Sequence, residues 1–374
     1  MAATPPPADG EASSLARSLA IALLAIAGLA FHLSPWSDRA NLVLVDAAFG
    51  VLRAIQPKPA PHDIVIVGMG GASAGLGGDA VDPMFRKMPD ALVRIARGKP
   101  RAVALEVVLP SASLESTLPG FDDAMATALV VTQAAAPLVI GMAVDSRRQL
   151  VPIHEPLLRG VDSRAFAFTL LPRDDDGVVR QVVLALPTRQ GSWPTLSGWL
   201  CEVLSARCEE GMIDYALGPD YTVLPLKRLL DIRDDETLGR LFKDRIVFVA
   251  PVDRLQDRVP LAARLAGWES VSWDAPAVLG HAQTLRTLLH GRPVREIPLP
   301  MAIVVIAAAA LLARVPRALA WPSLGLATAG ALVGGLVALR FGYHVPLAAP
   351  LATLVVAPFV GRWLQGGARA VPRN

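Results

Sequence analysis

The sequence predicts an α/β fold with a mostly parallel sheet and flanking helices in an extracytoplasmic domain, together with four transmembrane helices. Short apolar runs such as 63–68, 101–109 and 245–250 are typical of strands buried on both faces, and helical segments separate most of them. Hydrophobic residues fill 53% of the 374 positions, and the mean hydropathy of +0.44 is too high for an ordinary soluble protein. These observations indicate a membrane protein that carries one folded domain.

Four stretches of span length carry no charged residue, and a charge at the bilayer centre costs roughly 2.5–3.5 kcal/mol. The stretches are 18–37, 297–313, 318–339 and 341–361. The predicted organisation is a cytoplasmic tail over 1–17, a transmembrane helix over 18–34, the extracytoplasmic domain over 35–297, transmembrane helices over 298–314, 318–339 and 345–363, and a cytoplasmic tail over 364–374. We expect the first helix to be a retained anchor and not a signal peptide, because no convincing small-x-small cleavage site follows it.

The arginines beside these stretches predict which side of the membrane each segment occupies. If the N-terminus is cytoplasmic, the inside arginines are Arg17, Arg314, Arg317, Arg362, Arg369 and Arg373. Only Arg340 then lies in a short outside loop. We therefore expect a multi-pass protein of the bacterial inner (plasma) membrane, in contact with lipid, with both termini cytoplasmic and the main domain periplasmic.

Gly330 and Gly334 form a small-xxx-small pair in the third expected span. Such a pair is typical of a homodimer face, and equally of close packing against the second and fourth spans of the same chain. The sequence leaves both interpretations open.

The extracytoplasmic domain is predicted to begin as β-α-β-α-β after a helix over 41–55. Its first elements are a strand over 63–68, a helix with Pro89 in its first turn that ends at Gly98, a strand over 101–109, a helix from Asp122 and a strand over 137–144. The later elements are a strand over 178–186, a helix over 194–208, a strand over 245–250 and a helix over 275–290 that ends at Gly291. A domain of this size buries a sizeable core without metal or disulfide help.

The pI of about 9.1 suggests nucleic-acid binding until the charges are located. Between Asp38 and Glu296 there are 29 Lys and Arg against 31 Asp and Glu, whereas the rest of the chain holds seven Arg against two acids. The positive excess thus lies beside the apolar stretches and not on a face that could follow phosphates. Nucleic acid is therefore not expected as a partner.

The sharpest catalytic candidate is Ser73, in the G-x-S-x-G match of residues 71–75 after a predicted strand. The residues that would complete a hydrolase triad in the expected order are Asp253, Asp257 and His281. The motif needs a helix directly after the serine, but residues 76–83 have the composition of a loop. We therefore expect no catalytic residue and no enzyme, and a serine hydrolase remains a remote alternative that predicts fluorophosphonate labelling of Ser73.

No cofactor and no metal site is predicted. The glycines after the first strand are misplaced for a dinucleotide fingerprint, and no Walker A sequence occurs. The carboxylates of 174–177 suit Ca²⁺ only loosely, because the spacing of an EF-hand loop is absent, and a turn that feeds the strand with Arg180 explains them better. The histidines have no close ligand spacing.

Cys201 and Cys208 lie seven residues apart on the expected helix over 194–208. That separation corresponds to a rise of about 10.5 Å along a helix, which is beyond the reach of a disulfide. The two cysteines can therefore pair only if the helix ends before Cys208.

The order of several local segments resembles the second class of CHASE sensors, the extracellular sensory domains associated with cyclases and histidine kinases. The similar segments are the opening strand and serine-bearing turn (63–73), the acidic helix start (121–128), the acidic turn with arginine (174–180), the late strand with an Asp-bearing loop (245–258) and the His-Ala helix before the second span (280–291). The last of these is the most specific. The resemblance covers about residues 18–363.

The resemblance implies a receptor in signal transduction that senses or binds something outside the cytoplasm. At the matched positions Asp176, Arg180, Asp257 and His281 either contact a ligand or brace the fold. Two positions depart from the family, because Gly70 replaces an acid in the first turn, and the run starting at Glu106 replaces an Asp-x-x-Phe motif. If those acids contact a ligand in relatives, ligand sensing in this chain has changed.

No output domain follows the last expected span, although such receptors normally carry one on the same chain. The leading hypothesis is therefore signalling to a separate effector chain, a cyclase or a kinase. The alternative is a non-catalytic structural or scaffold subunit of a bacterial envelope complex, which predicts stable co-purification with other subunits regardless of any small molecule.

Overall fold

The computed structural model describes residues 9–70, 85–145, 149–189, 191–252, 257–268 and 274–367. The chain forms two compact units. The helical unit comprises residues 1–52 and 294–374, and the α/β unit comprises residues 53–293. Residues 35–52, which we expected in the extracytoplasmic domain, therefore cluster with the helical unit.

The helical unit is organised around its last helix. Its elements are α1 (Asp9–His32), α2 (Pro35–Ile55), β13 (Arg295–Glu296), α9 (Leu299–Ala310), the 3₁₀ turn η3 (Leu311–Arg314), α10 (Arg317–Arg340), β14 (Tyr343–His344) and α11 (Ala348–Gly367). Helix α11 contacts α1, α9 and α10. Gly28 allows α1 to approach α11 closely, because a Cβ at this position would lie 2.4 Å from Thr353 Oγ1. A hydrogen bond also joins α2 to the start of α11, where Asn41 Oδ1 accepts from the Ala348 backbone N–H at 2.8 Å.

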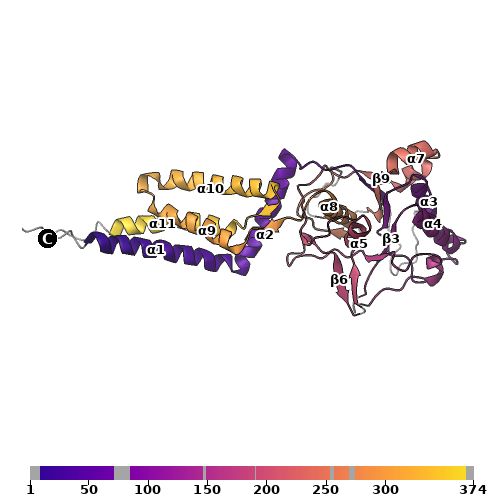
Figure 1. Cartoon of the computed structure of the whole chain (residues 1–374), viewed down its shortest axis with the longest axis horizontal. Helices are drawn as coiled ribbons and strands as arrows, with labels where there is room; N and C mark the ends of the chain where they lie inside the picture. The colour runs from indigo at the N-terminus through magenta and orange to yellow at the C-terminus, as the bar shows by residue number, and fades with distance from the viewer. Residues whose placement is uncertain are drawn as a thin grey trace, which may run out of the picture. The chain divides into compact units, whose positions relative to one another are not determined.

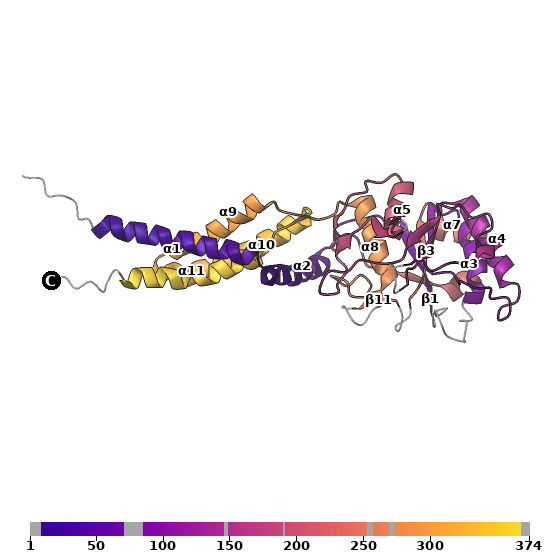
Figure 2. The same ribbon diagram turned by 90° about the horizontal axis from the view of Figure 1, so that it is seen from below.

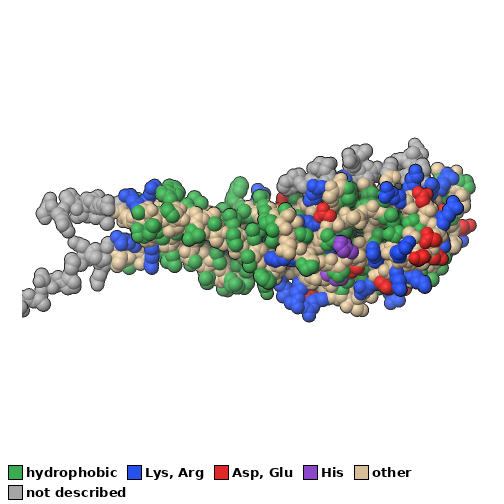
Figure 3. All heavy atoms as spheres, turned by 90° about the horizontal axis from the view of Figure 1, so that it is seen from above, with side chains coloured by type: hydrophobic (Ala, Val, Ile, Leu, Met, Phe, Trp, Pro, Cys, Tyr) green, Lys and Arg blue, Asp and Glu red, His purple; other side chains and the backbone are tan. Residues whose placement is uncertain are grey.

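Two helices of this unit are long and apolar enough to cross a membrane, Ser14–His32 of α1 and all of α10. The segment Leu299–Arg314 is apolar but shorter. Figure 3 shows hydrophobic side chains over most of the visible surface of the helical unit, whereas acidic side chains gather on the α/β unit. The spans expected over 298–314 and 345–363 stay predictions.

The α/β unit is built on a six-stranded sheet in the order β4-β3-β2-β10-β1-β9, and every neighbouring pair is parallel. The strands are β1 (Ile64–Met69), β2 (Ala102–Leu105), β3 (Leu138–Met142), β4 (Phe166–Phe168), β9 (Val223–Pro225) and β10 (Ile246–Pro251). Strand β10 lies between β1 and β2, with Ile64 opposite Ile246 and Ala102 opposite Ile246 on its other side. The predicted α/β class and mostly parallel sheet are confirmed.

Helices cover both faces of this sheet, as Figures 1 and 2 show. The helices α3 (Met88–Arg97), α4 (Phe121–Ala135), α6 (Leu226–Asp231) and α7 (Asp235–Phe242) share one core with the strands, and α5 (Leu196–Val203) and α8 (Ala277–His290) pack on the other face. Leu105 of β2 belongs to the first core. Because side chains alternate along a strand, the next residue, Glu106, points toward the α8 face.

The prediction of a single strand over 178–186 is wrong. The chain forms β5 (Gln181–Val182), which pairs with β8 (Gly211–Met212), and then β6 (Ala185–Thr188), which forms a hairpin with β7 (Gly191–Pro194). The pairing partner changes at Leu184, whose carbonyl accepts from the Thr195 backbone N–H at 2.9 Å. An apolar run predicts extended backbone but not the strand with which it pairs.

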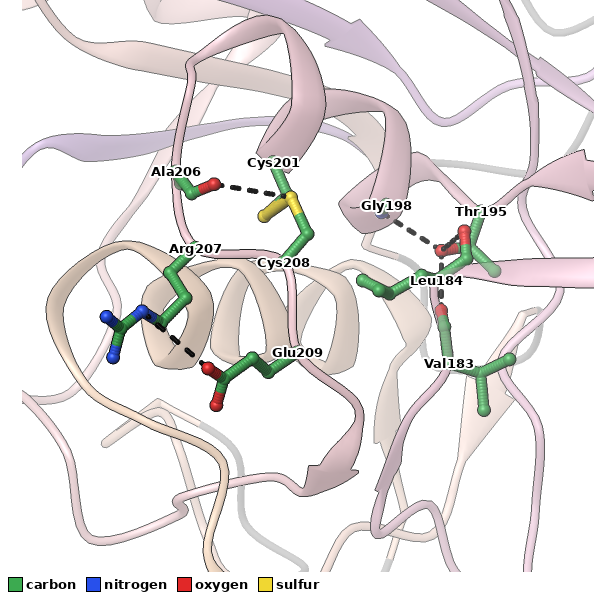
Figure 4. Close-up of a disulfide and its surroundings, with 9 residues drawn as sticks. All are labelled: Val183, Leu184, Thr195, Gly198, Cys201, Ala206, Arg207, Cys208 and Glu209. Atoms are coloured by element: carbon green, nitrogen blue, oxygen red, sulfur yellow. Dashed lines mark hydrogen bonds and ion pairs between the residues drawn. A yellow bond between two sulfur atoms is a disulfide. The ribbon is translucent and has the colours of Figure 1, made fainter.

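The helix expected over 194–208 is shorter and spans only Leu196–Val203 (Figure 4). Thr195 caps its start by accepting from the Gly198 N–H at 3.0 Å, and Ser205 ends it by adopting a left-handed φ of 53°. The chain therefore turns back, and Cys201 and Cys208 form a disulfide with their Cα atoms 5.8 Å apart. The condition for pairing is thus met, because the helix ends before Cys208.

Candidate functional site

The carboxyl ends of the parallel strands meet at one edge of the sheet, where open α/β sheets commonly bind ligands. Glu106 directly follows β2, and Thr169 directly follows β4. Asp257 follows β10 along the chain, and α8 brings His281 to the same edge from its second turn. Strand direction and one helix thus assemble a cluster from four distant parts of the sequence.

Glu106 and His281 form the centre of this cluster, and both side chains are buried, with 2% and 0% of their surface exposed. His281 Nε2 lies 2.9 Å from the Thr169 carbonyl oxygen and 3.4 Å from Glu106 Oε1. A carbonyl can only accept, so Nε2 carries the proton. Among the described residues, His281 Nδ1 and both Glu106 carboxyl oxygens find no hydrogen-bond partner.

Burial decides the protonation of this pair. It raises the pKa of Glu106 well above 4.5, and the Asp257 carboxylate nearby raises it further. Burial also lowers the pKa of His281 to about 4, although the hydrogen bond to Thr169 opposes the change. The site therefore favours a neutral carboxylic acid beside a neutral imidazole, because a charged form would be poorly solvated on either residue.

Asp257 connects this cluster to the start of α8. Its backbone adopts a left-handed φ of 51°, and its carbonyl oxygen accepts from the Ala277 N–H at 2.9 Å. Burial raises the pKa of the Asp257 carboxyl, and the positive charge of Arg173 partly offsets the shift. A displacement of Asp257 would therefore move Ala277, the first residue of α8.

Asp176 and Arg180 lie in a separate ion pair. The Arg180 guanidinium is 1% exposed and makes two 2.8 Å contacts to the Asp176 carboxylate, with a third contact of 3.1 Å to Asp174. Gly177, with a left-handed φ of 85°, lets the chain turn between the partners. These hydrogen bonds lower the pKa of Asp176, so the pair stays charged. Its geometry is that of a brace across a turn.

Residues 283–287 of α8 bind a loop of residues 214–220, here called the junction loop. Gln283 Nε2 donates to the carbonyl oxygens of Asp214 and Leu217 at 2.6 and 3.0 Å. Arg286 donates to the carbonyl oxygens of Leu217 and Pro219, and Thr287 Oγ1 accepts from the Asp214 N–H. The junction loop is thus fixed to one face of α8.

The junction loop also holds the chain where it enters the α/β unit. Lys58 Nζ lies 2.6 Å from an Asp214 carboxylate oxygen, and its backbone bonds to Ala216 and Gly218. Arg53 pairs with Asp220 at 2.6 Å. Near the end of α8, His290 Nε2 lies 2.5 Å from Asp63 Oδ2, directly before β1. The entering and leaving segments of the α/β unit are therefore both tied to α8.

Ser73 and the glycines of its motif lie outside the described residues, as does Asp253. His281, which would act as the base of that triad, is fully buried with its protonated nitrogen on Thr169. Among the described residues, no group of three His, Cys, Asp or Glu side chains is arranged to hold a metal ion. Gly70 ends the described segment after β1, with no described atom within 4 Å of a Cβ built there.

The comparisons with known proteins bear on this arrangement. A family model of the CHASE2 domain matches residues 20–315. The chain belongs to the CHASE2 family. CHASE2 domains are extracellular sensory domains, so this is a membrane protein with an extracellular sensory domain. The chain matches no curated protein and no solved structure.

Sequence reasoning missed the contacts of α8 with the junction loop in this CHASE2 domain. A signal was present, because Gln283, Arg286 and Thr287 recur at i, i+3 and i+4 on one face of a helix that is otherwise mostly apolar. Polar side chains on a buried face require hydrogen-bond partners. The sequence did not indicate where those partners lie, since the junction loop is more than 60 residues away.

Proposed function

We propose that this CHASE2 protein is a bacterial inner-membrane sensor that signals to a separate effector chain, a cyclase or a kinase. One observation carries the proposal: α8 bears His281 of the buried cluster in its second turn, and the junction-loop contacts of Gln283, Arg286 and Thr287 follow on the same helix. Residues 277–288 of this helix are all buried. A helix enclosed on all sides cannot shift without moving the groups packed around it.

A stimulus at the carboxyl edge of the sheet would act through this helix. A ligand shifts a conformational equilibrium only if it binds one arrangement better than the other. Displacement of Asp257 or of the Glu106–His281 pair would move the start of α8, and the polar contacts of Gln283 and Arg286 would pass that movement to the junction loop. The chain enters and leaves the α/β unit beside that loop, so both connections to the helical unit would respond.

The proposed topology places the α/β unit in the periplasm and both termini in the cytoplasm. The disulfide between Cys201 and Cys208 supports this placement, since disulfides persist in oxidising compartments. The excess of arginine in the expected inside segments supports it independently.

A homodimer through α10 is part of the proposal. No described atom lies within 4 Å of a Cβ built at Gly330 or at Gly334, so none of the described residues packs closely on this small-xxx-small pair. Close packing within the chain occurs instead at Gly335, where a Cβ would lie 2.7 Å from Leu347. The face with Gly330 and Gly334 remains accessible to a second copy within the bilayer.

The test is isolation of the tagged chain from native membranes, followed by assay of any associated cyclase or kinase. We expect the wild-type chain to recover an active effector, and Lys58→Met to change its output, because Asp214 would lose the partner that anchors the entering chain. The matched control Lys227→Met alters an exposed lysine on α6 and should leave the output unchanged. Recovery of no effector, or equal output from all three chains, would sink the proposal.

A further inference from the structure

A cleft of about 740 Å³ opens at the edge of the sheet opposite the Glu106–His281 cluster. It lies beside the amino ends of β3 and β4, between α5 and strand β7. Its lining includes Trp193 on β7, Trp199 and Glu202 on α5, and Phe166 on β4. Its volume falls within the range of roughly 300–1,000 Å³ that is typical of small-molecule sites.

The α5 wall of this cleft is held in place at several points. Trp199 Nε1 donates to the Arg164 carbonyl oxygen at 2.7 Å, which fixes the orientation of its indole ring. Gly198 packs so tightly that a Cβ there would lie 2.0 Å from the Leu184 carbonyl oxygen, and the Cys201–Cys208 disulfide anchors the end of the helix (Figure 4). A site with preformed walls loses less conformational entropy when it binds a ligand.

The charges that line the cleft do not balance. Asp162 and Arg164 pair with each other at 3.3 Å, and the backbone N–H and guanidinium of Arg164 lower the pKa of Asp162. Glu202 follows Trp199 by three residues on α5, so the two side chains share a face of the helix. Among the described residues, none forms a hydrogen bond or ion pair with the Glu202 carboxylate. One negative charge therefore stands beside two indole rings without a counter-charge.

We propose that this cleft binds a small organic cation of the alkylated ammonium class. The faces of indole rings attract cations, and recognition of quaternary ammonium groups by aromatic side chains uses this attraction. Glu202 would balance the ligand charge, whereas an anion would meet repulsion from it. This inference goes beyond the proposed function, because it assigns a second site at the other edge of the sheet, and the binding it predicts needs no effector.

The probes are choline, tetramethylammonium and 3,3-dimethyl-1-butanol, which is the neutral isostere of choline. Binding to the full-length chain is measured by titration calorimetry in a maltoside detergent, since detergents with choline head groups would compete. We expect saturable binding of both cations, and binding of the neutral isostere that is weaker by about tenfold or more.

Two variants locate the binding, each with a matched control. Trp193→Leu and Glu202→Gln should each weaken choline binding by about tenfold. Trp268→Leu, at an exposed tryptophan outside the cleft, and Glu236→Gln, at an exposed acid on α7, should not. Glu202 is exposed, so its variant folds even if Trp193→Leu does not.

Three results would overturn the proposal: no binding of either cation to the folded chain, equal affinity for choline and its neutral isostere, or unchanged choline affinity in Glu202→Gln. None of these results depends on the effector. If choline does not bind, the proposed transmission through α8 is therefore not contradicted. If no effector is recovered, the proposed cation site is not contradicted.

Discussion

At the scale of single residues, Glu106 and His281 show how burial alters two common side chains. At the surface, a Glu beside a His would form a weak ion pair at neutral pH. In the core of the α/β unit the same residues favour their neutral forms, because neither charge is solvated there. The pair Asp176–Arg180 behaves differently, since three contacts to Arg180 compensate the buried guanidinium.

The pKa shifts of Glu106 and His281 make the stability of the fold depend on pH in opposite directions. The contribution of Glu106 is fully present below its unfolded pKa near 4.5 and is lost as the pH rises through its raised folded pKa. The contribution of His281 is present above its unfolded pKa of 6.5 and is lost as the pH falls through about 4.

Glu106→Gln should therefore gain stability relative to the wild-type chain as the pH rises from 4.5 to 8, because glutamine needs no proton to remain neutral. The difference grows by at most about 1.4 kcal/mol per pH unit inside the titration window. Urea unfolding of the full chain in detergent at several pH values measures it, with the exposed Glu236→Gln as control. A constant difference between the two chains across this range would show that Glu106 titrates normally.

At the scale of elements, α8 and α5 have different tasks on the same face of the sheet. Helix α8 is buried over 277–288 and links the carboxyl-edge cluster to the junction loop. Helix α5 is short, is capped by Thr195 and is closed at its far end by the disulfide. The first therefore suits the transmission of a movement, whereas the second suits the rigid wall of a cleft.

Cys201→Ser should lower the free energy of unfolding of the α/β unit by about 2–3 kcal/mol, because the short loop that the disulfide closes would gain chain entropy in the unfolded state. Thermal unfolding of the wild-type chain with and without reductant measures the same quantity. Cys208→Ser should match Cys201→Ser, and reductant should not affect either variant. A wild-type chain that is indifferent to reductant would contradict the role given to the disulfide.

At the scale of the whole molecule, the chain divides into a unit that suits lipid and a unit that suits water. Helix α10 exposes large apolar side chains such as Leu326 and Val333 along its length, as expected for a helix in a bilayer. The α/β unit instead buries two separate helical layers against its sheet. The arginines beside the apolar stretches carry the prediction that the α/β unit lies outside the cytoplasm.

Topology can be tested with single cysteines, since the native pair is oxidised and does not react with maleimides. Glu236→Cys on α7 should react with a membrane-impermeant maleimide in cells with a permeabilised outer membrane. Val315→Cys, between Arg314 and Arg317 in the expected inside loop, should react only after lysis. The reverse pattern would place the α/β unit in the cytosol and contradict the proposed sensory topology.

Strands β1, β2, β3 and β10 were predictable because each is a continuous apolar run, and a strand buried on both faces needs one. Helix α3 was predictable from Pro89 and Gly98, which mark its ends. The run 178–186 was misassigned because its pairing depends on Thr195 and on β8, which local sequence does not reveal. The length of α5 depended on the backbone conformation of Ser205, for which the sequence gives no clear signal.

Local composition alone determined the class of this protein: apolar runs fix which segments enter lipid or a sheet core, and the free-energy cost of burying charge fixes where they end. Only the tertiary structure decided that Glu106 is neutral and lies close to His281. It also decided the hydrogen bonds of α8 to the junction loop and the unpaired charge of Glu202. Each depends on the solvation and the distance of groups that lie far apart along the chain, and those quantities exist only once the chain has folded.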